Sequence, residues 1–174
     1  MSGVPPLLKA PLSPQDRLRR LLRVAKVDGL SVLIVAGGFG LLSAAFGDLS
    51  GAGVGLVIAL AGAIELWGVS LLRSGSLGGL RWLVGSQAYL LAMIFAYAAW
   101  RLANLAHDPI VRAINRAILT AGADPELLPF DAHQIMKATY VLLVLVTLLY
   151  QGGMIVYYAR RRTAVAQALK APLN

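Results

Sequence analysis

Four long stretches almost free of charged residues constrain this chain more than any other feature. They are residues 30–47, 49–72, 82–100 and 138–159. Each reaches the roughly 18 residues that mark a membrane span. In hydrocarbon every backbone N–H and C=O group needs an internal partner, and such segments obtain one as helices. Because the stretches lack the alternating pattern of barrel strands, the sequence predicts an all-α integral membrane protein with a four-transmembrane-helix bundle.

The composition supports a membrane protein and excludes several kinds of chemistry. Of the 174 residues, 58% are hydrophobic and 14% are charged, whereas a soluble domain carries about 25% charged residues. There is no cysteine, which excludes disulfides, thiol catalysis and thiolate metal sites. The common nucleotide-binding, metal-binding and hydrolase motifs are also absent from the sequence. We therefore expect no cofactor, and the sequence does not favour an enzyme.

The apolar stretches divide the chain into three parts. Residues 1–27 form a cytoplasmic tail with a basic amphipathic helix, residues 28–159 form the bundle, and residues 160–174 form a second basic tail. Within the bundle, we expect the four spans at residues 29–47, 50–72, 82–104 and 135–159. The long outer loop is expected at residues 105–134.

The placement of basic residues predicts the orientation. Of the sixteen lysines and arginines, twelve precede the first span, flank the second loop or follow the last span. The other four are in the third loop, where four acidic residues offset them. The positive-inside rule then places both termini in the cytoplasm and the third loop outside the cell (inner) membrane. The basic face would attract anionic lipid headgroups, and no nucleic acid is expected as a partner.

Two short helices are predicted outside the spans. Ser13 is a good N-cap and Pro14 suits the first helical position. The segment that follows is either a basic amphipathic helix on the membrane surface or a plain basic anchor for the first span, and both interpretations stay open. In the outer loop, Asp108 and Pro109 begin an amphipathic helix that ends near Gly122.

Small residues recur at four-residue spacing in the first two spans, where helices in lipid associate through close backbone approach. The two ridges are Ala36, Gly40 and Ala44, and Gly51, Gly55, Ala59 and Ala63. We expect them to face each other, and a ridge left uncovered would serve a second protomer. The chain is accordingly expected to form homo-oligomers or to join a membrane complex.

The sequence of this hairpin, GLLSAAFG followed by GLVIALAGAIELWG, resembles the helical hairpins of the HdeD-type acid-resistance membrane proteins. The resemblance covers the hairpin alone and rests on small and aliphatic residues. It implies a packed pair of spans, and it carries no function.

Glu65 is the one charged residue inside an otherwise apolar span. At about 1.5 Å per residue, Glu65, Gln87 and Gln151 lie roughly 8–12 Å from the cytoplasmic ends of their spans, with Ser31 somewhat shallower. We predict an intramembrane polar layer in which Glu65 faces the bundle interior and bonds to Gln87 or Gln151. Both a structural and a functional role stay open, since intramembrane acids are costly and often functional.

The two histidines flank the outer loop, each beside an aspartate. His107, His133, Asp108 and Asp131 could together bind a divalent metal ion. Both aspartates also suit helix capping, however, and Asp131 with Gln134 forms a capping box. We therefore expect capping and no metal site.

Three functions compete. The first is a non-enzymatic scaffold or subunit of a membrane complex. The alternative is a small oligomeric proton- or cation-coupled transporter or channel that uses Glu65. In its four spans and one membrane-embedded glutamate the chain resembles the small multidrug transporters, but Glu65 is in the second span and the outer loop is long, so no residue role carries over. The third, an enzyme acting on lipid or quinone, lacks a nucleophile–base pair.

Overall fold

The computed structural model describes residues 13–105, 109–121 and 131–170, and every regular element within these ranges is a helix. The elements are α1 (Pro14–Ala45), α2 (Leu49–Arg73), α3 (Gly78–Ala103), α4 (Pro109–Thr120), α5 (Ala132–Arg160) and α6 (Arg162–Lys170). By length and composition, α1, α2, α3 and α5 could each cross a membrane. The predicted all-helical fold with four membrane-length helices is confirmed.

Side-chain caps fix where three of the long helices begin. The Ser13 hydroxyl accepts a hydrogen bond from the backbone N–H of Asp16, and Asp131 forms the expected capping box with Gln134. Asp48 caps α2 by accepting from the N–H of Gly51. This bond, together with one from the Ser50 hydroxyl, holds the pKa of Asp48 below its ordinary value. The caps thus set the register in which each helix presents its side chains.

The first helix is longer than predicted. The segment before the first span and the span itself form one continuous helix, α1, with no break near residue 28. Its apolar face is covered by protein: Leu21 and Ala25 are fully buried and share a core cluster with Val165 of α6. A partner helix was not visible in the sequence, which is why this face suggested a membrane surface. Residues 14–27 and 162–170 are therefore part of the packed fold.

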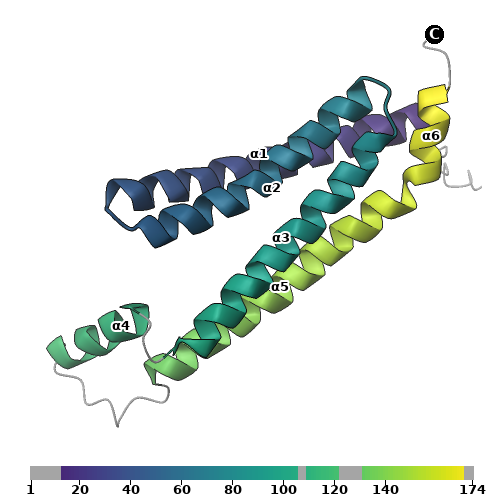
Figure 1. The fold of residues 1–174 in the computed structure, drawn as a ribbon. Helices are drawn as coiled ribbons and strands as arrows, with labels where there is room; N and C mark the ends of the chain where they lie inside the picture. Colours follow the sequence, from purple (N-terminus) through teal and green to yellow (C-terminus); the bar gives the residue numbers. More distant parts are fainter. Residues whose placement is uncertain (1–12, 106–108, 122–130, 171–174) are drawn as a thin grey trace, which may run out of the picture.

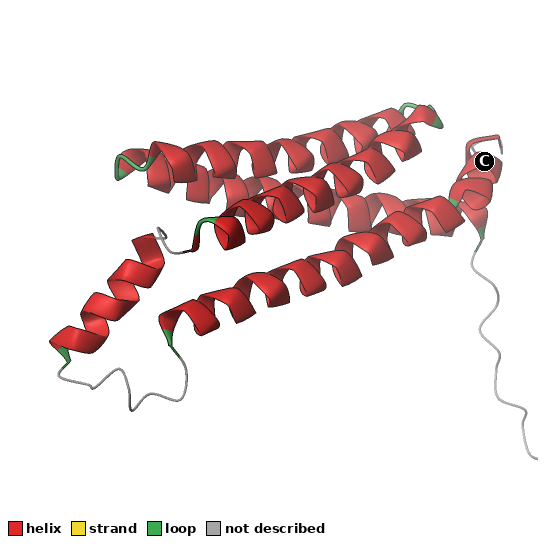
Figure 2. Cartoon of the chain, turned by 60° about the horizontal axis from the view of Figure 1, so that its bottom comes forward, coloured by secondary structure: helices red, strands yellow, loops and turns green. Residues whose placement is uncertain are grey.

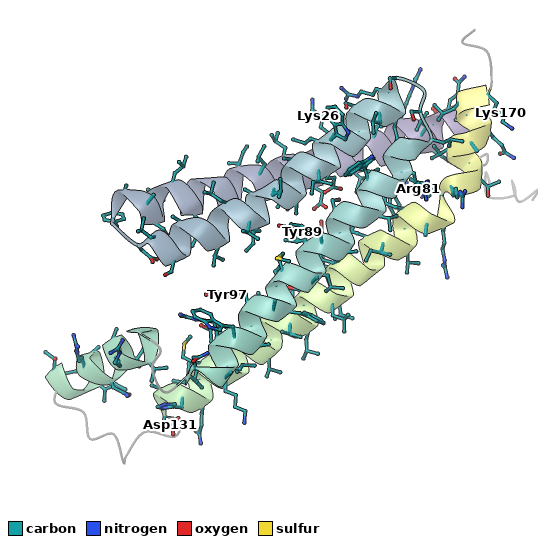
Figure 3. The ribbon with its side chains drawn as sticks, viewed as in Figure 1. Lys26, Arg81, Tyr89, Tyr97, Asp131 and Lys170 are labelled. Atoms are coloured by element: carbon teal, nitrogen blue, oxygen red, sulfur yellow. The ribbon has the colours of Figure 1, made fainter. Side chains whose placement is uncertain are left out.

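The four long helices form two pairs that diverge. Helices α1 and α2 make one antiparallel hairpin, α3 and α5 lie side by side, and the contact between α2 and α3 joins the pairs. In Figure 1 the pairs meet near the start of α1 and spread apart toward α4, and Figure 2 shows the same helices turned by 60°. Figure 3 shows Arg81 and Lys170 at the end where the pairs meet and Asp131 at the far end of α5. The bundle is thus open along one side.

Part of each predicted small-residue ridge forms the α1–α2 contact. A Cβ added to Gly55 would lie 2.5 Å from the Cα of Gly40, and Ala36 and Ala59 are also buried. Gly51 is half-buried at the start of α2, whereas Ala44 and Ala63 are exposed. A strict four-residue spacing drifts about 40° around a helix at each step, which carries the ends of both ridges off the contact.

A second core cluster fastens α4 to the other end of the α3–α5 pair. Val111 of α4 packs with Ala98 of α3 and with Met136 and Tyr140 of α5. Arg101 donates from Nε to the Tyr140 hydroxyl at 2.8 Å. A helix therefore occupies part of the predicted outer loop, and its apolar residues contact the protein.

Candidate functional site

Glu65 is buried where the two helix pairs meet. Its side chain is 1% exposed, and so is that of Gln87 in α3. The Gln87 Nε2 donates a hydrogen bond to Oε2 of Glu65 at 2.9 Å. The structure thus brings together two of the four residues predicted for the polar layer.

A second carboxylate, which the sequence analysis missed, lies beside Glu65. Asp28 of α1 is 7% exposed, and its Oδ2 accepts a hydrogen bond of 2.8 Å from the same Nε2 of Gln87. Because one nitrogen binds both oxygens, the two carboxylates lie within the ~6 Å over which like charges disfavour each other. The site therefore contains an acidic pair.

Two tyrosines of α5 complete the network. Tyr158, fully buried, donates from its hydroxyl to Oε1 of Glu65 at 2.6 Å. Tyr150 donates to Oδ1 of Asp28 at 2.8 Å, although its ring is half exposed. Each of the four carboxylate oxygens thus accepts one hydrogen bond from a neutral donor. Among the described residues, no lysine or arginine donates a hydrogen bond to either carboxylate.

Glycine contacts bring these side chains together. Gly29 follows Asp28 and lies against Gly62, three residues before Glu65; a Cβ on Gly62 would be 2.5 Å from the Gly29 carbonyl oxygen. Between α2 and α3, a Cβ on Gly68 would be 2.9 Å from the carbonyl oxygen of Gly79. Such backbone approach requires residues without side chains.

A hollow of about 410 Å³ opens beside the acidic pair. It is lined by residues of all four membrane-length helices, and its walls are mainly apolar, as with Val35, Ile58 and Leu90. Asp28 and Gln151 contribute polar groups. The hollow is open to the outer surface of the molecule, where Val35 is 71% exposed, and it combines apolar walls with a few polar groups, as small-molecule sites do.

The hydrogen-bonding groups at the site are unbalanced toward acceptors. Both amide hydrogens of Gln87 and both tyrosine hydroxyls are used on the carboxylates. The Oε1 atoms of Gln87 and Gln151 are buried and have no partner. Buried acceptors without donors are costly, so the site suits a ligand that carries hydrogens or positive charge.

The other predicted members of the layer contribute differently. Gln151 is 6% exposed and lines the hollow, but the hydrogen bonds to Glu65 come from Gln87 and Tyr158. Ser31 also lines the hollow and donates to the backbone oxygen of Asp28 at 2.8 Å. Both residues are thus at the site without bonding Glu65.

The missed residues had signals in the sequence. Asp28 is an acid at the edge of an apolar stretch, next to the basic residues Arg23 and Lys26. Gln151 and Tyr158 are seven residues apart, about two helical turns, and so lie on the same face of α5, with Tyr150 beside that face. Tyr158 lies near the end of a span, where tyrosines usually belong to an interfacial aromatic belt, so its position alone does not indicate a role at a buried site.

The proposed metal ligands can be followed in part. His107 and Asp108 lie outside the described residues. His133 is exposed, and Asp131 caps α5. Within residues 13–105, 109–121 and 131–170, no group of three or more His, Cys, Asp and Glu side chains could hold a metal ion.

In comparisons with known proteins, no family model, no curated protein and no solved structure matches this chain.

Proposed function

We propose that the chain is a four-span protein of the cell (inner) membrane that moves protons, and uses the acidic pair Asp28–Glu65 to couple them to transport of a second solute. Both termini and the α2–α3 turn are cytoplasmic in this proposal. The observation that carries it is the sharing of one amide nitrogen, Gln87 Nε2, by the two buried carboxylates. This favours the transporter over the scaffold among the functions that the sequence left open.

The charge of the pair supports proton binding. An ionised carboxylate moved from water into a low-dielectric interior costs several kcal/mol even after relaxation. Two such groups close together repel each other, so one of them holds a proton. The tyrosine donors around the pair are neutral: Tyr150 donates to Asp28, and Tyr158 donates to Glu65. A single exchangeable proton between two helices is a suitable coupling element.

The hollow supports a second solute. It adjoins Asp28 and has apolar walls contributed by α1, α2 and α3. Its unpartnered acceptor, Gln151 Oε1, would receive a hydrogen from a bound solute. Displacement of the shared proton by such a solute would link the two movements through competition for the same carboxylates.

A pH jump tests the proposal without knowledge of the solute. Proteoliposomes of the full chain on a solid-supported membrane are exposed to a rapid pH step, and the displaced charge is recorded. The wild-type protein is expected to give a transient current, because protons enter a site inside the membrane. Asp28→Asn and Glu65→Gln are expected to reduce it severalfold, and the double variant to abolish it.

Asp48→Asn is the matched control, because Asp48 is an exposed carboxylate in the α1–α2 turn; its current should equal that of the wild type. A wild-type protein without a transient current, or a double variant with the full current, would refute proton binding by the pair. If a Na⁺ step at constant pH produced a current, the coupling ion would be a metal cation and not the proton.

Self-association and membership of a larger complex remain separate predictions. Much of the small-residue surface predicted to support them is used inside the chain, at the Gly40–Gly55 contact. The exposed Ala44 and Ala63 are left for a second protomer.

A further inference from the structure

Three arginines line one hollow at the end of the molecule where the helix pairs meet. Arg17 belongs to the first turn of α1, Arg160 ends α5, and Arg161 connects α5 to α6. Ala164 of α6 completes the lining, and the hollow has a volume of about 360 Å³. Residues far apart in the sequence thus present guanidinium groups to the same space.

Packing around the hollow holds the arginines in place. Helix α6 lies beside the start of α1 in Figure 1, and its Val165 is buried in the same cluster as Leu21 of α1. The guanidinium carbon of Arg161 lies 4.6 Å from the ring centroid of Tyr157, within the range of a cation–π contact. The cluster is therefore set by the fold.

Charge at this end of the molecule is strongly one-sided. The described basic residues here are Arg17, Arg19, Arg20, Arg23, Lys26, Arg73, Arg81, Arg160, Arg161, Arg162 and Lys170. Apart from the buried acidic pair, Asp16 is the one described carboxylate at this end, and its Oδ2 accepts a hydrogen bond from Ser13. The described part of this end therefore has a large excess of positive charge, which favours anionic ligands.

We infer that this hollow binds the phosphate group of an anionic membrane lipid. Guanidinium groups present paired donors that match phosphate oxygens. Arg160 and Arg161 directly follow the apolar stretch of α5, where basic residues typically mark the membrane–water interface, the level at which lipid phosphates lie. The bound phosphate would hold the α5–α6 junction against the start of α1. This inference does not rest on proton transport.

Native mass spectrometry of the full chain tests this site. The detergent-solubilised protein is mixed with equal amounts of phosphatidylglycerol and phosphatidylcholine, and the retained lipids are counted. The wild type should retain phosphatidylglycerol preferentially. Arg160→Gln with Arg161→Gln should lower that retention about tenfold or more, since one basic residue near an anionic surface contributes a factor of about five.

A control at the same end separates a site from general attraction. Arg20→Gln with Lys26→Gln removes the same charge from exposed positions that do not line the hollow, and it should leave retention nearly unchanged. Arg160→Lys with Arg161→Lys should restore part of the binding, which excludes misfolding as the cause of its loss. Equal loss in both Gln double variants, or a wild type without preference, would overturn the inference. Displacement of the lipid by millimolar glycerol 1-phosphate would assign the hollow to a soluble phosphate instead.

Discussion

Gly29 and Gly62 contact each other backbone to backbone. A Cβ on Gly62 would lie 2.5 Å from the Gly29 carbonyl oxygen and 2.8 Å from the backbone nitrogen of Leu33. This approach places Asp28 next to Glu65, because each glycine lies within one turn of one carboxylate. The geometry of the acidic pair therefore depends on two residues that carry no chemistry of their own.

Gly62→Ala should destabilise the protein, because the added methyl group meets backbone atoms that cannot move aside. Overpacking of this kind typically costs about 1–3 kcal/mol. The control is Gly38→Ala, whose Cβ would meet nothing within 4 Å; it should be neutral or mildly stabilising, since alanine favours helix over glycine by about 1 kcal/mol. Thermal unfolding in detergent compares them, and equal shifts would show that the contact is not needed.

Tyr158→Phe should also destabilise the protein, because Oε1 of Glu65 loses its donor while it stays buried. Leaving a buried acceptor unsatisfied costs about 1–3 kcal/mol. Tyr89→Phe is the matched control: the Tyr89 hydroxyl donates to the backbone oxygen of Val57 at an exposed position, and its loss should stay within about 0.5 kcal/mol. If both variants melt at the wild-type temperature, the Tyr158 bond contributes nothing to stability.

Gln87→Leu should make stability depend more strongly on pH. The amide is the common donor to both carboxylates. Loss of the amide should lower the melting temperature little in acid, where both carboxylates are protonated. It should lower the melting temperature progressively more as rising pH removes the shared proton. Melting temperatures of Gln87→Leu and of Gln167→Leu, which changes an exposed glutamine of α6, are compared across this range. A Gln87→Leu deficit that is constant with pH would contradict a shared proton.

The orientation can be tested with single cysteines, since the chain has none. Thr120 in α4 and Ser76 between α2 and α3 are both exposed. In intact cells an impermeant thiol reagent should label Thr120→Cys, and it should label Ser76→Cys only after permeabilisation. The reverse pattern would place both termini outside.

The sequence was sufficient to predict much of the helical framework. Long apolar stretches can satisfy their backbone in lipid only as helices, and the caps at Ser13 and Asp131 follow from local chemistry. Depth arithmetic along the spans also placed Glu65 and Gln87 at one level, where the structure shows their hydrogen bond. These features depend on the residue spacing within one helix, or on the depth of a residue along the membrane normal that all the spans share.

Features that depend on how helices pack were not predictable in the same way. Asp28 lies at the boundary between the basic tail and the first apolar stretch, where no role was predicted for it, whereas the packing of α6 against α1 buries Leu21 and Ala25 in the turns that precede it. The close glycine contact between the two helix pairs is at Gly68–Gly79, near the α2–α3 turn, and the pairs diverge away from it, whereas Gly29–Gly62 lies within the α1–α2 pair. A four-residue pattern does not reveal which of several glycines meets a partner.

Infrared difference spectroscopy tests the central claim, that Asp28 and Glu65 share one proton, most directly. The carbonyl band of a protonated carboxylic acid is recorded while the pH of the reconstituted protein is raised. The wild type should lose the band of about one buried carboxylic acid. Glu65→Gln and Asp28→Asn should each alter that band, and Asp48→Asn should leave it unchanged. A wild-type spectrum without this band at any pH, or one that both site variants leave unchanged, would contradict the account.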